Sequence, residues 1–173
     1  HSNVAVGYQA LEDNTTAVYN TALGYQALRN NTVGTRNVAV GNNALDANTE
    51  GEYNVAVGRN ALYANTDASS NTALGSDALS ANTTGGSNVA VGRNALLSNT
   101  TANYNIAMGT DALYTNTTGT RNVAIGEDAL EANDTGNDNT AVGSYALTLN
   151  TASNNTAVGS YSLDANTTGE NNV

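Results

Sequence analysis

The chain of 173 residues contains no cysteine, proline, lysine, tryptophan or phenylalanine, and its only histidine is His1. Without cysteine, a disulfide scaffold and a cysteine-based metal site are excluded. No apolar run approaches the roughly 18 residues that a transmembrane helix needs. Five arginines face fifteen acidic residues, giving a net charge of −10, so the clustered cations of a nucleic-acid groove are missing.

Large aliphatic residues are also scarce, whereas 30 Asn, 28 Ala and 24 Thr make up close to half of the chain. A composition this poor in Leu, Ile and Val would be typical of disorder. The apolar residues nevertheless recur at strictly regular places, which favours a folded chain. We therefore predict a single repeat domain over residues 1–173.

The sequence repeats with a period of 17 residues. Each unit begins with Asn-x-Ala-aliphatic-Gly, and the spacing is 17 except for 16 between the last two full units. The units start at Asn3, Asn20, Asn37, Asn54, Asn71, Asn88, Asn105, Asn122, Asn139 and Asn155, and a further one begins at Asn172. Numbered from this Asn, position 3 is Ala, position 5 is Gly, position 9 is Leu and position 12 is Asn. The short unit lacks one residue around 151–154, which predicts a loop there that tolerates deletion.

Seventeen residues are too few for a pair of helices, and they suit one coil of a β-solenoid. The β-forming residues at positions 2 and 4 predict a short strand. The Gly at position 5 (Gly7, Gly24 and Gly41 in the first units) predicts a turn with positive φ or a close backbone approach. Ala-Leu at positions 8 and 9 predicts a second short strand, and Asn-Thr at positions 12 and 13 a second turn. The fold class is therefore predicted as all-β, a parallel β-solenoid of about ten coils spaced about 4.8 Å apart.

Identical side chains should then form files along the rod. We expect Leu11, Leu28 and Leu45 to stack in the core, and two asparagine files to form hydrogen-bonded ladders. An aspartate file would instead place like charges about 4.8 Å apart. In the first coils the ladders comprise Asn3, Asn20 and Asn37 at position 1, and Asn14, Asn31 and Asn48 at position 12.

The predicted core is small for the entropy lost on ordering each coil, which suggests that partner chains bury additional surface. The strand face that carries Asn, Ala and Gly presents only small groups, so we expect another chain to approach there. We predict a homo-oligomer, with a trimer favoured. The chain also begins and ends in phase with the repeat and shows no atypical capping segment, which predicts head-to-tail filaments or ends covered by neighbouring subunits.

The strings Asn-Val-Ala-Val-Gly and Asn-Thr-Ala-Leu-Gly, each followed by Ala-Leu, resemble the head repeats of trimeric autotransporter adhesins. The fuller string at 71–85 is similar to repeats of bacterial surface proteins and phage tail-fibre-like proteins. This unit is longer than the adhesin head repeat. The resemblance implies a left-handed β-roll, a tight trimer, and an extracellular location on a cell surface or a virion fibre.

The sequence contains few residues of the types that catalyse reactions. Lys and Cys are absent and His1 is terminal, which leaves no ordinary base for a Ser or Thr nucleophile, so no enzyme activity and no cofactor are expected. Asp134 and Asp138 lie in an oxygen-rich stretch that suits Ca²⁺, although we favour a solvated turn.

Two further sets of residues are candidate surface sites. Tyr19, Tyr53 and Tyr104 share position 17 with Arg36 and Arg121, and such residues are enriched at recognition surfaces, although ordinary surface variation is an equal alternative. Six asparagines at position 12 lie in glycosylation sequons, although Asn-Thr is also turn chemistry and we favour that interpretation. The six are Asn14, Asn82, Asn99, Asn116, Asn133 and Asn166.

These observations predict a non-enzymatic structural segment of an extracellular fibre, a rigid and self-assembling β-solenoid shaft. One alternative is an adhesin head or phage tail-fibre module that binds a receptor or glycan. A lesser alternative is an ice-binding solenoid that uses the threonines at positions 13 and 14. No nucleic-acid partner and no membrane insertion are expected.

Overall fold

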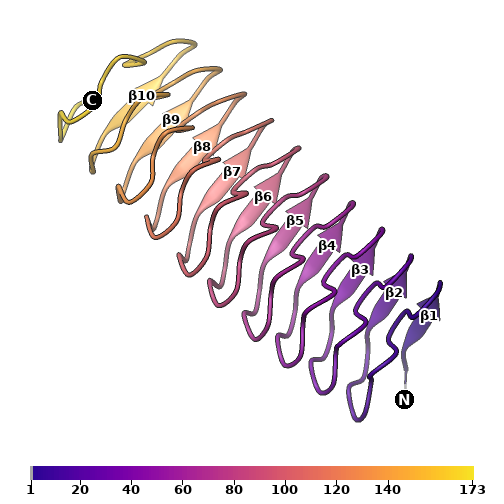
Figure 1. Ribbon diagram of the computed structural model, residues 1–173. Coiled ribbons are helices and arrows are strands. Elements are labelled where there is room, and N and C mark those ends of the chain that lie inside the picture. The colour runs from indigo at the N-terminus through magenta and orange to yellow at the C-terminus, as the bar shows by residue number, and fades with distance from the viewer. Residues whose placement is uncertain (1) are drawn as a thin grey trace.

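The computed structural model describes residues 2–173 as a rod in which each coil contributes one three-residue strand (Figure 1). All strands belong to one ten-stranded parallel sheet in the order β1 to β10. The prediction of a parallel β-solenoid with 17-residue coils is confirmed. The strands are β1 (Val4–Val6), β2 (Thr21–Leu23), β3 (Val38–Val40), β4 (Val55–Val57), β5 (Thr72–Leu74), β6 (Val89–Val91), β7 (Ile106–Met108), β8 (Val123–Ile125), β9 (Thr140–Val142) and β10 (Thr156–Val158).

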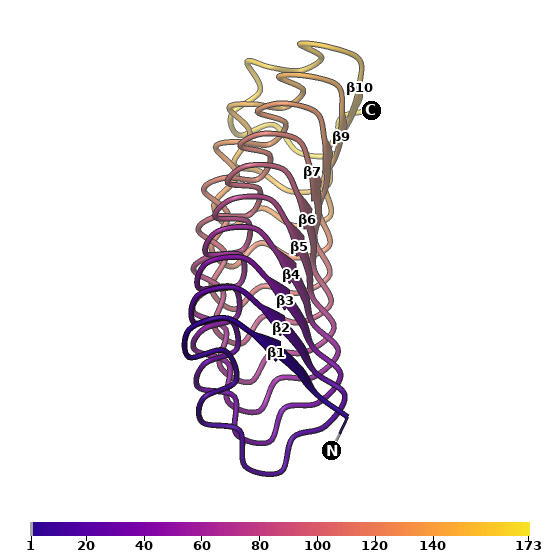
Figure 2. The same ribbon diagram turned by 90° about the vertical axis from the view of Figure 1, so that its right-hand side faces the viewer.

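The sheet runs along one side of the rod, with the N-terminal coil at one end and the C-terminal coil at the other (Figures 1 and 2). Each strand residue pairs with the equivalent residue one coil later, as Ala73 does with Ala90. The same register holds across the short unit, where Thr140 pairs with Thr156. The missing residue is therefore absorbed outside the sheet, as the loop interpretation predicts.

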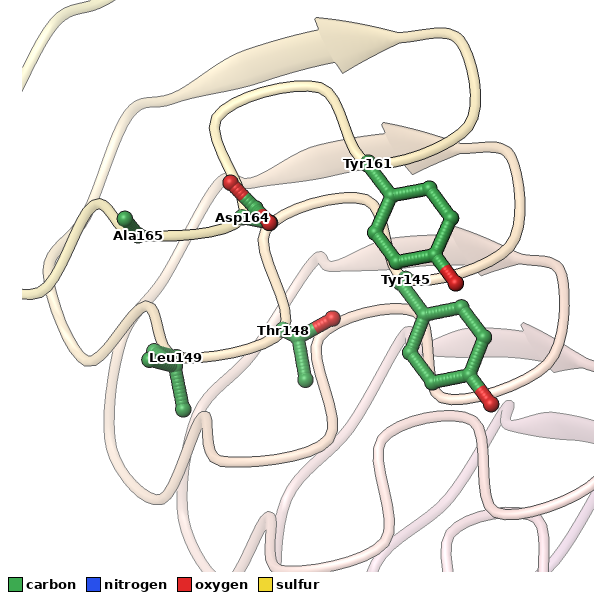
Figure 3. Close-up of a pocket in the computed structure, with 6 residues that line it drawn as sticks. All are labelled: Tyr145, Thr148, Leu149, Tyr161, Asp164 and Ala165. Atoms are coloured by element: carbon green, nitrogen blue, oxygen red, sulfur yellow. The ribbon is translucent and has the colours of Figure 1, made fainter.

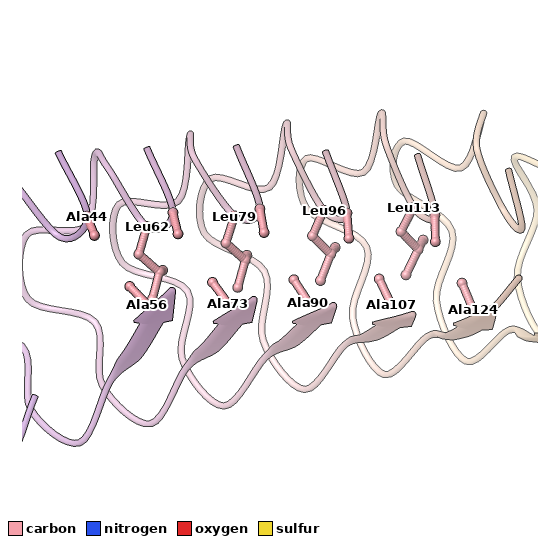
Figure 4. Close-up of a cluster of buried hydrophobic side chains, with 14 of the residues drawn as sticks. Ala44, Ala56, Leu62, Ala73, Leu79, Ala90, Leu96, Ala107, Leu113 and Ala124 are labelled. Atoms are coloured by element: carbon pink, nitrogen blue, oxygen red, sulfur yellow. The ribbon is translucent and has the colours of Figure 1, made fainter. Parts of the chain in front are cut away.

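The apolar core is formed by three small or medium side chains per coil. The alanines of positions 3 and 8 and the leucine of position 9 are fully buried in the central coils. Figure 4 shows Leu62, Leu79, Leu96 and Leu113 as one file that faces the strand alanines. The first leucines align in the same file, because Leu11 N–H donates to Ala27 O at 3.1 Å and Leu28 N–H to Ala44 O at 3.0 Å. Like side chains are thus stacked one coil apart along the whole rod.

The prediction of a second strand at positions 8 and 9 is wrong. That segment is a turn, and every leucine of position 9 has a left-handed backbone, with φ between 50° and 53°. A left-handed conformation costs a branched residue about 1–2 kcal/mol. Full burial of a leucine side chain contributes about 1.5–3 kcal/mol, and the file contacts add to it, so packing overrides the local preference.

The prediction that the small Asn-Ala-Gly face lies outside is also wrong. Ala73 and Ala90 are 0% exposed inside the coil, whereas the aliphatic residues of positions 2 and 4 point outward. Leu74 remains 47% exposed and Met108 41%. The interior has room only for alanine opposite the leucine file, so the larger strand side chains must take the outer face.

The glycine of position 5 has both properties predicted for it. In the ten full coils its φ lies between 126° and 144°, a region that is strained for any other residue. A Cβ on Gly75 would also overlap the carbonyl oxygen of Gly92 in the next coil. Two independent constraints therefore require glycine at this turn.

Replacing Gly75 with alanine should destabilise the rod by about 3 kcal/mol or more, because the new methyl group meets both backbone strain and a backbone oxygen. The free energy of unfolding from urea denaturation measures this loss. Gly86→Ser is the matched control, since its φ is not in the left-handed range and the same position carries Ser69 and Ser153 in other coils. Equal stability of the two variants would contradict the assignment.

Candidate functional site

From Asn31 to Asn133 the asparagines of position 12 form a ladder of side-chain amides inside the rod. Asn14, which was predicted to belong to it, does not join: its Oδ1 has no hydrogen-bond partner among the described residues, and Asn31 Nδ2 donates to Gly34 O instead. Asn48 Nδ2 donates to Asn31 Oδ1 at 2.8 Å, and Asn65 Nδ2 donates to Asn48 Oδ1 at 2.8 Å. The same Nδ2 also donates to the carbonyl at position 15 of its own coil, as Asn82 does to Gly85 O at 2.9 Å. Each amide from Asn48 to Asn133 therefore closes its own turn and joins two coils. At the short unit the pattern shifts, and Asn133 Oδ1 accepts from Asn139 Nδ2 at 3.4 Å.

The asparagines of position 1 form a second file with a different pattern from the amide-to-amide ladder that was predicted. Asn3 Oδ1 accepts the backbone N–H of Asn20 at 2.8 Å, and Asn20 Oδ1 accepts that of Asn37 at 2.8 Å. The Nδ2 atoms instead reach carbonyls across the coil, as Asn37 does to Gly51 O at 2.8 Å. Each of these side chains supplies hydrogen bonds both along the axis and across the coil.

Burial of the position-12 asparagines prevents glycosylation at most of the sequons. Asn82, Asn99, Asn116 and Asn133 are 0% exposed, and their Nδ2 atoms are engaged in the ladder. A glycan must be attached to Nδ2, so this fold leaves no room for one at these four positions. Asn14 and Asn166, in the first and last full coils, are only partly buried.

The arginines are used for contacts between coils. Four of them pair with an aspartate of the following coil, in the pairs Arg29–Asp46, Arg59–Asp77, Arg93–Asp111 and Arg121–Asp138. The fifth, Arg36, lies between two tyrosine rings, 5.4 Å from the centroid of Tyr19 and 5.3 Å from that of Tyr53. Tyr104, from the same position of a later coil, is 64% exposed.

The Arg29–Asp46 pair is the most buried of the four. Nη2 of Arg29 lies 3.0 Å from Oδ2 of Asp46, whose residue is only 3% exposed. Burial raises the pKa of Asp46, and the Arg29 charge partly opposes that shift. Among the described residues, Asp46 Oδ1 is buried without a hydrogen-bond partner. This carboxylate therefore depends on Arg29 to remain charged inside the rod.

The two weak metal candidates have protein partners. Asp138 receives two hydrogen bonds from Arg121, from Nε at 2.6 Å and from Nη2 at 2.8 Å. These bonds lower the pKa of Asp138. Asp134 accepts a hydrogen bond from the Thr117 hydroxyl. Residues 2–173 hold no group of three or more His, Cys, Asp or Glu arranged to bind a metal ion. His1, the only sequence candidate for a base, lies outside the described residues.

The threonines of position 13 bond to the backbone. Thr15 Oγ1 donates to Thr32 O at 2.8 Å, and Thr83 Oγ1 donates to Thr100 O at 3.0 Å. These hydroxyls strengthen the stacking of coils, and this arrangement gives no support to the ice-binding alternative.

Sequence reasoning missed two surface features. The first is the outward aliphatic face, defined as the residues of positions 2 and 4 in β1 to β10. Position 4 is aliphatic in every strand, whereas position 2 is Thr in β2, β5, β9 and β10 and Val or Ile in the others. Aliphatic residues of strands are normally buried, so the sequence pattern alone favours an inward orientation for them. The second is a stack of Tyr145 on Tyr161, with ring centroids 4.9 Å apart and an interplanar angle of 7°. The recurrence of Tyr at position 7 of two adjacent coils is the signal that could have found it.

Comparison with known proteins found no matching family model, no matching curated protein and no matching solved structure. Residues 2–173 also include no helix of the length and apolar character needed to cross a membrane.

Changing Asn82 to Asp should destabilise the rod by about 3 kcal/mol at neutral pH. The variant loses both Nδ2 donors and buries a charge between Asn65 and Asn99. Burial raises the pKa of this carboxyl above its unfolded value, so stability should recover as the pH falls and the group binds a proton. Urea denaturation at pH 7 and pH 4 measures both effects. Asn42→Asp, with the same charge change at an exposed position, should cost little, and an equal loss in both variants would refute the ladder's role.

Changing Arg29 to Ala should cost about 1–3 kcal/mol at pH 7, because the Asp46 carboxylate then loses the one hydrogen-bond donor that it has within residues 2–173. Without Arg29 the pKa of Asp46 rises further above its unfolded value. The loss should therefore shrink as the pH is lowered and Asp46 becomes protonated. Thermal or urea unfolding across pH 4 to 7 tests this. Arg59→Ala removes an exposed pair and should cost less than about 1 kcal/mol at every pH. A pH-independent loss in the Arg29 variant would argue against the pairing.

Proposed function

We propose that the chain is a non-enzymatic structural segment of an extracellular fibre, a stiff shaft that assembles with copies of itself. The observation that carries this proposal is the outward aliphatic face. It forms two parallel files of side chains on a regular sheet, and Val4, Leu23, Leu74 and Met108 are between 41% and 56% exposed. Extended exposed apolar surfaces of this kind mark interaction sites.

A second copy of the chain is the partner that suits this face best. Both rods would share the same axial spacing of about 4.8 Å, so the side chains of one file fit between those of another along the full length. A different partner would need to reproduce that repeat. Most homo-oligomers have closed symmetry, and a trimer with the face turned inward is favoured by the resemblance to trimeric adhesin heads.

Stiffness is supported by the direction of the hydrogen bonds. Strand pairs, turn amides and both asparagine files all link one coil to the next along the rod. Bending the rod would stretch several of these bonds in every coil at once. A shaft of this kind holds an adhesive tip or a neighbouring subunit away from the surface that bears it.

The second candidate function is a binding module of an adhesin head or phage tail fibre. The exposed ring of Tyr104 and the Tyr19–Arg36–Tyr53 sandwich favour it, because Tyr and Arg dominate recognition surfaces. Electron micrographs separate the two functions. Unbroken stacking of coils across chain ends favours the shaft, whereas a discrete trimer with a distinct tip that binds a glycan or receptor favours the module. Antibody labelling of intact source cells or virions tests the extracellular location.

Placing arginines on the outward aliphatic face should abolish assembly. We expect the unaltered chain to sediment as more than one copy and to form rods in negative stain. The double variant Leu74→Arg with Met108→Arg should sediment as a monomer with unchanged circular dichroism, because the charges cannot be buried between copies. The control Thr84→Arg with Thr118→Arg adds the same charge at exposed positions and should assemble normally. A monomeric unaltered chain, or equal behaviour of both variants, would overturn the proposal.

A further inference from the structure

A groove of about 270 Å³ lies on the lateral surface between the ninth and tenth coils. Figure 3 shows two tyrosine rings on one side of it, and the other lining residues on the opposite side. The groove belongs neither to the outward aliphatic face nor to the asparagine ladders. Its lining residues are Tyr145, Thr148, Leu149, Tyr161, Asp164 and Ala165.

The aromatic wall is confined to these two coils. Tyr145 and Tyr161 occupy position 7 with φ of 60° and 58°, and their rings lie parallel, one coil apart. In the eight preceding coils the same position carries only Gln, Asn or Asp. The π faces of the rings are regions of negative potential. Two stacked rings therefore give the groove a broad surface that favours a cation.

The polar groups of the groove have the same preference. Asp164 has no ion-pair partner within residues 2–173, where every arginine is already engaged with an aspartate or with tyrosine rings. Thr148 Oγ1 is buried and has no hydrogen-bond partner among the described residues. The nearby carboxylates of Glu127 and Asp128 raise the pKa of Tyr145, which reports a negative potential at this wall.

The rod itself shows how such groups hold a cation. Arg36 lies between two tyrosine rings, and Arg93 lies 3.0 Å from a carboxylate oxygen of Asp111 in the next coil. The groove combines both kinds of partner, two rings and a carboxylate, and contains no arginine. It offers one carboxylate where a bare metal ion needs several ligands, and Leu149 adds an apolar surface for an alkyl stem.

We propose that this groove binds an organic cation of the alkylguanidinium class, the group carried by agmatine or by an arginine side chain. The rings of Tyr145 and Tyr161 take the planar cation, and Asp164 accepts its N–H groups. The net charge of −10 raises the local concentration of cations around the rod. The proposal does not depend on self-assembly through the aliphatic face.

Equilibrium dialysis with labelled agmatine tests the proposal and works in any assembly state. We expect saturable binding at one site per chain that weakens with added salt. Tyr145→Asn with Tyr161→Asn should weaken it about fivefold or more, and Asp164→Asn should do the same. Asparagine is the matched replacement for the tyrosines, because Asn43, Asn60 and Asn94 occupy the same position with similar φ. The control Tyr8→Ser with Tyr25→Ser removes the other stacked pair and should leave binding unchanged.

Two further ligands are compared with agmatine. One distinguishes an arginine side chain of a partner protein from a small free cation, and the other tests whether the groove binds a neutral saccharide instead. A blocked Gly-Arg-Gly peptide that binds tighter than agmatine identifies an arginine of a partner protein, and equal binding identifies a small free cation; both outcomes support the proposal. Methyl glucoside, a neutral saccharide that could stack on the same rings, should not bind measurably. Glucoside binding as tight as agmatine, absence of saturable agmatine binding, or unchanged binding in the groove variants would overturn it.

Discussion

Hydrogen bonding along the rod axis is the constraint on which the rest of the structure depends. The backbone N–H and C=O groups of one coil, and the amides of two buried asparagines, find many of their partners in the next coil. A buried amide without a partner costs about 1–3 kcal/mol, so each coil is stable only in register with its neighbour. This explains why Asn48 and its equivalents recur in every unit, and why the missing residue lies in a turn where the sheet register is preserved.

Close stacking also fixes the size of the interior. Coils this close leave room for Ala, Leu and Asn side chains, and a Cβ at Gly75 would already overlap the next coil. Larger strand side chains such as Leu74 must face outward. The small core and the exposed aliphatic face therefore have one cause. A rod built in this way buries little apolar surface of its own and leaves aliphatic side chains of the strands exposed.

Charged side chains also form contacts along the rod axis. Four arginines connect successive coils through aspartates, and Arg36 does so through tyrosine rings. Most of the acidic residues are left without an arginine partner, so the surface is strongly negative. The groove beside Tyr145 and Tyr161 is the place where this negative potential meets an aromatic wall and an apolar floor.

The sequence by itself determined the period, the parallel stacking, the leucine file and the glycine turn, because a strict repeat forces identical residues into identical environments. It did not determine which strand face is inside, since alternation at positions 2 and 4 is compatible with either orientation. Only the tertiary structure decided that Ala73 is buried and Leu74 exposed, because the width of the coil sets the space available. The left-handed backbone of Leu79 likewise could not be predicted from the sequence, because leucine has no local preference for that conformation. Only packing against the neighbouring coils compensates its strain.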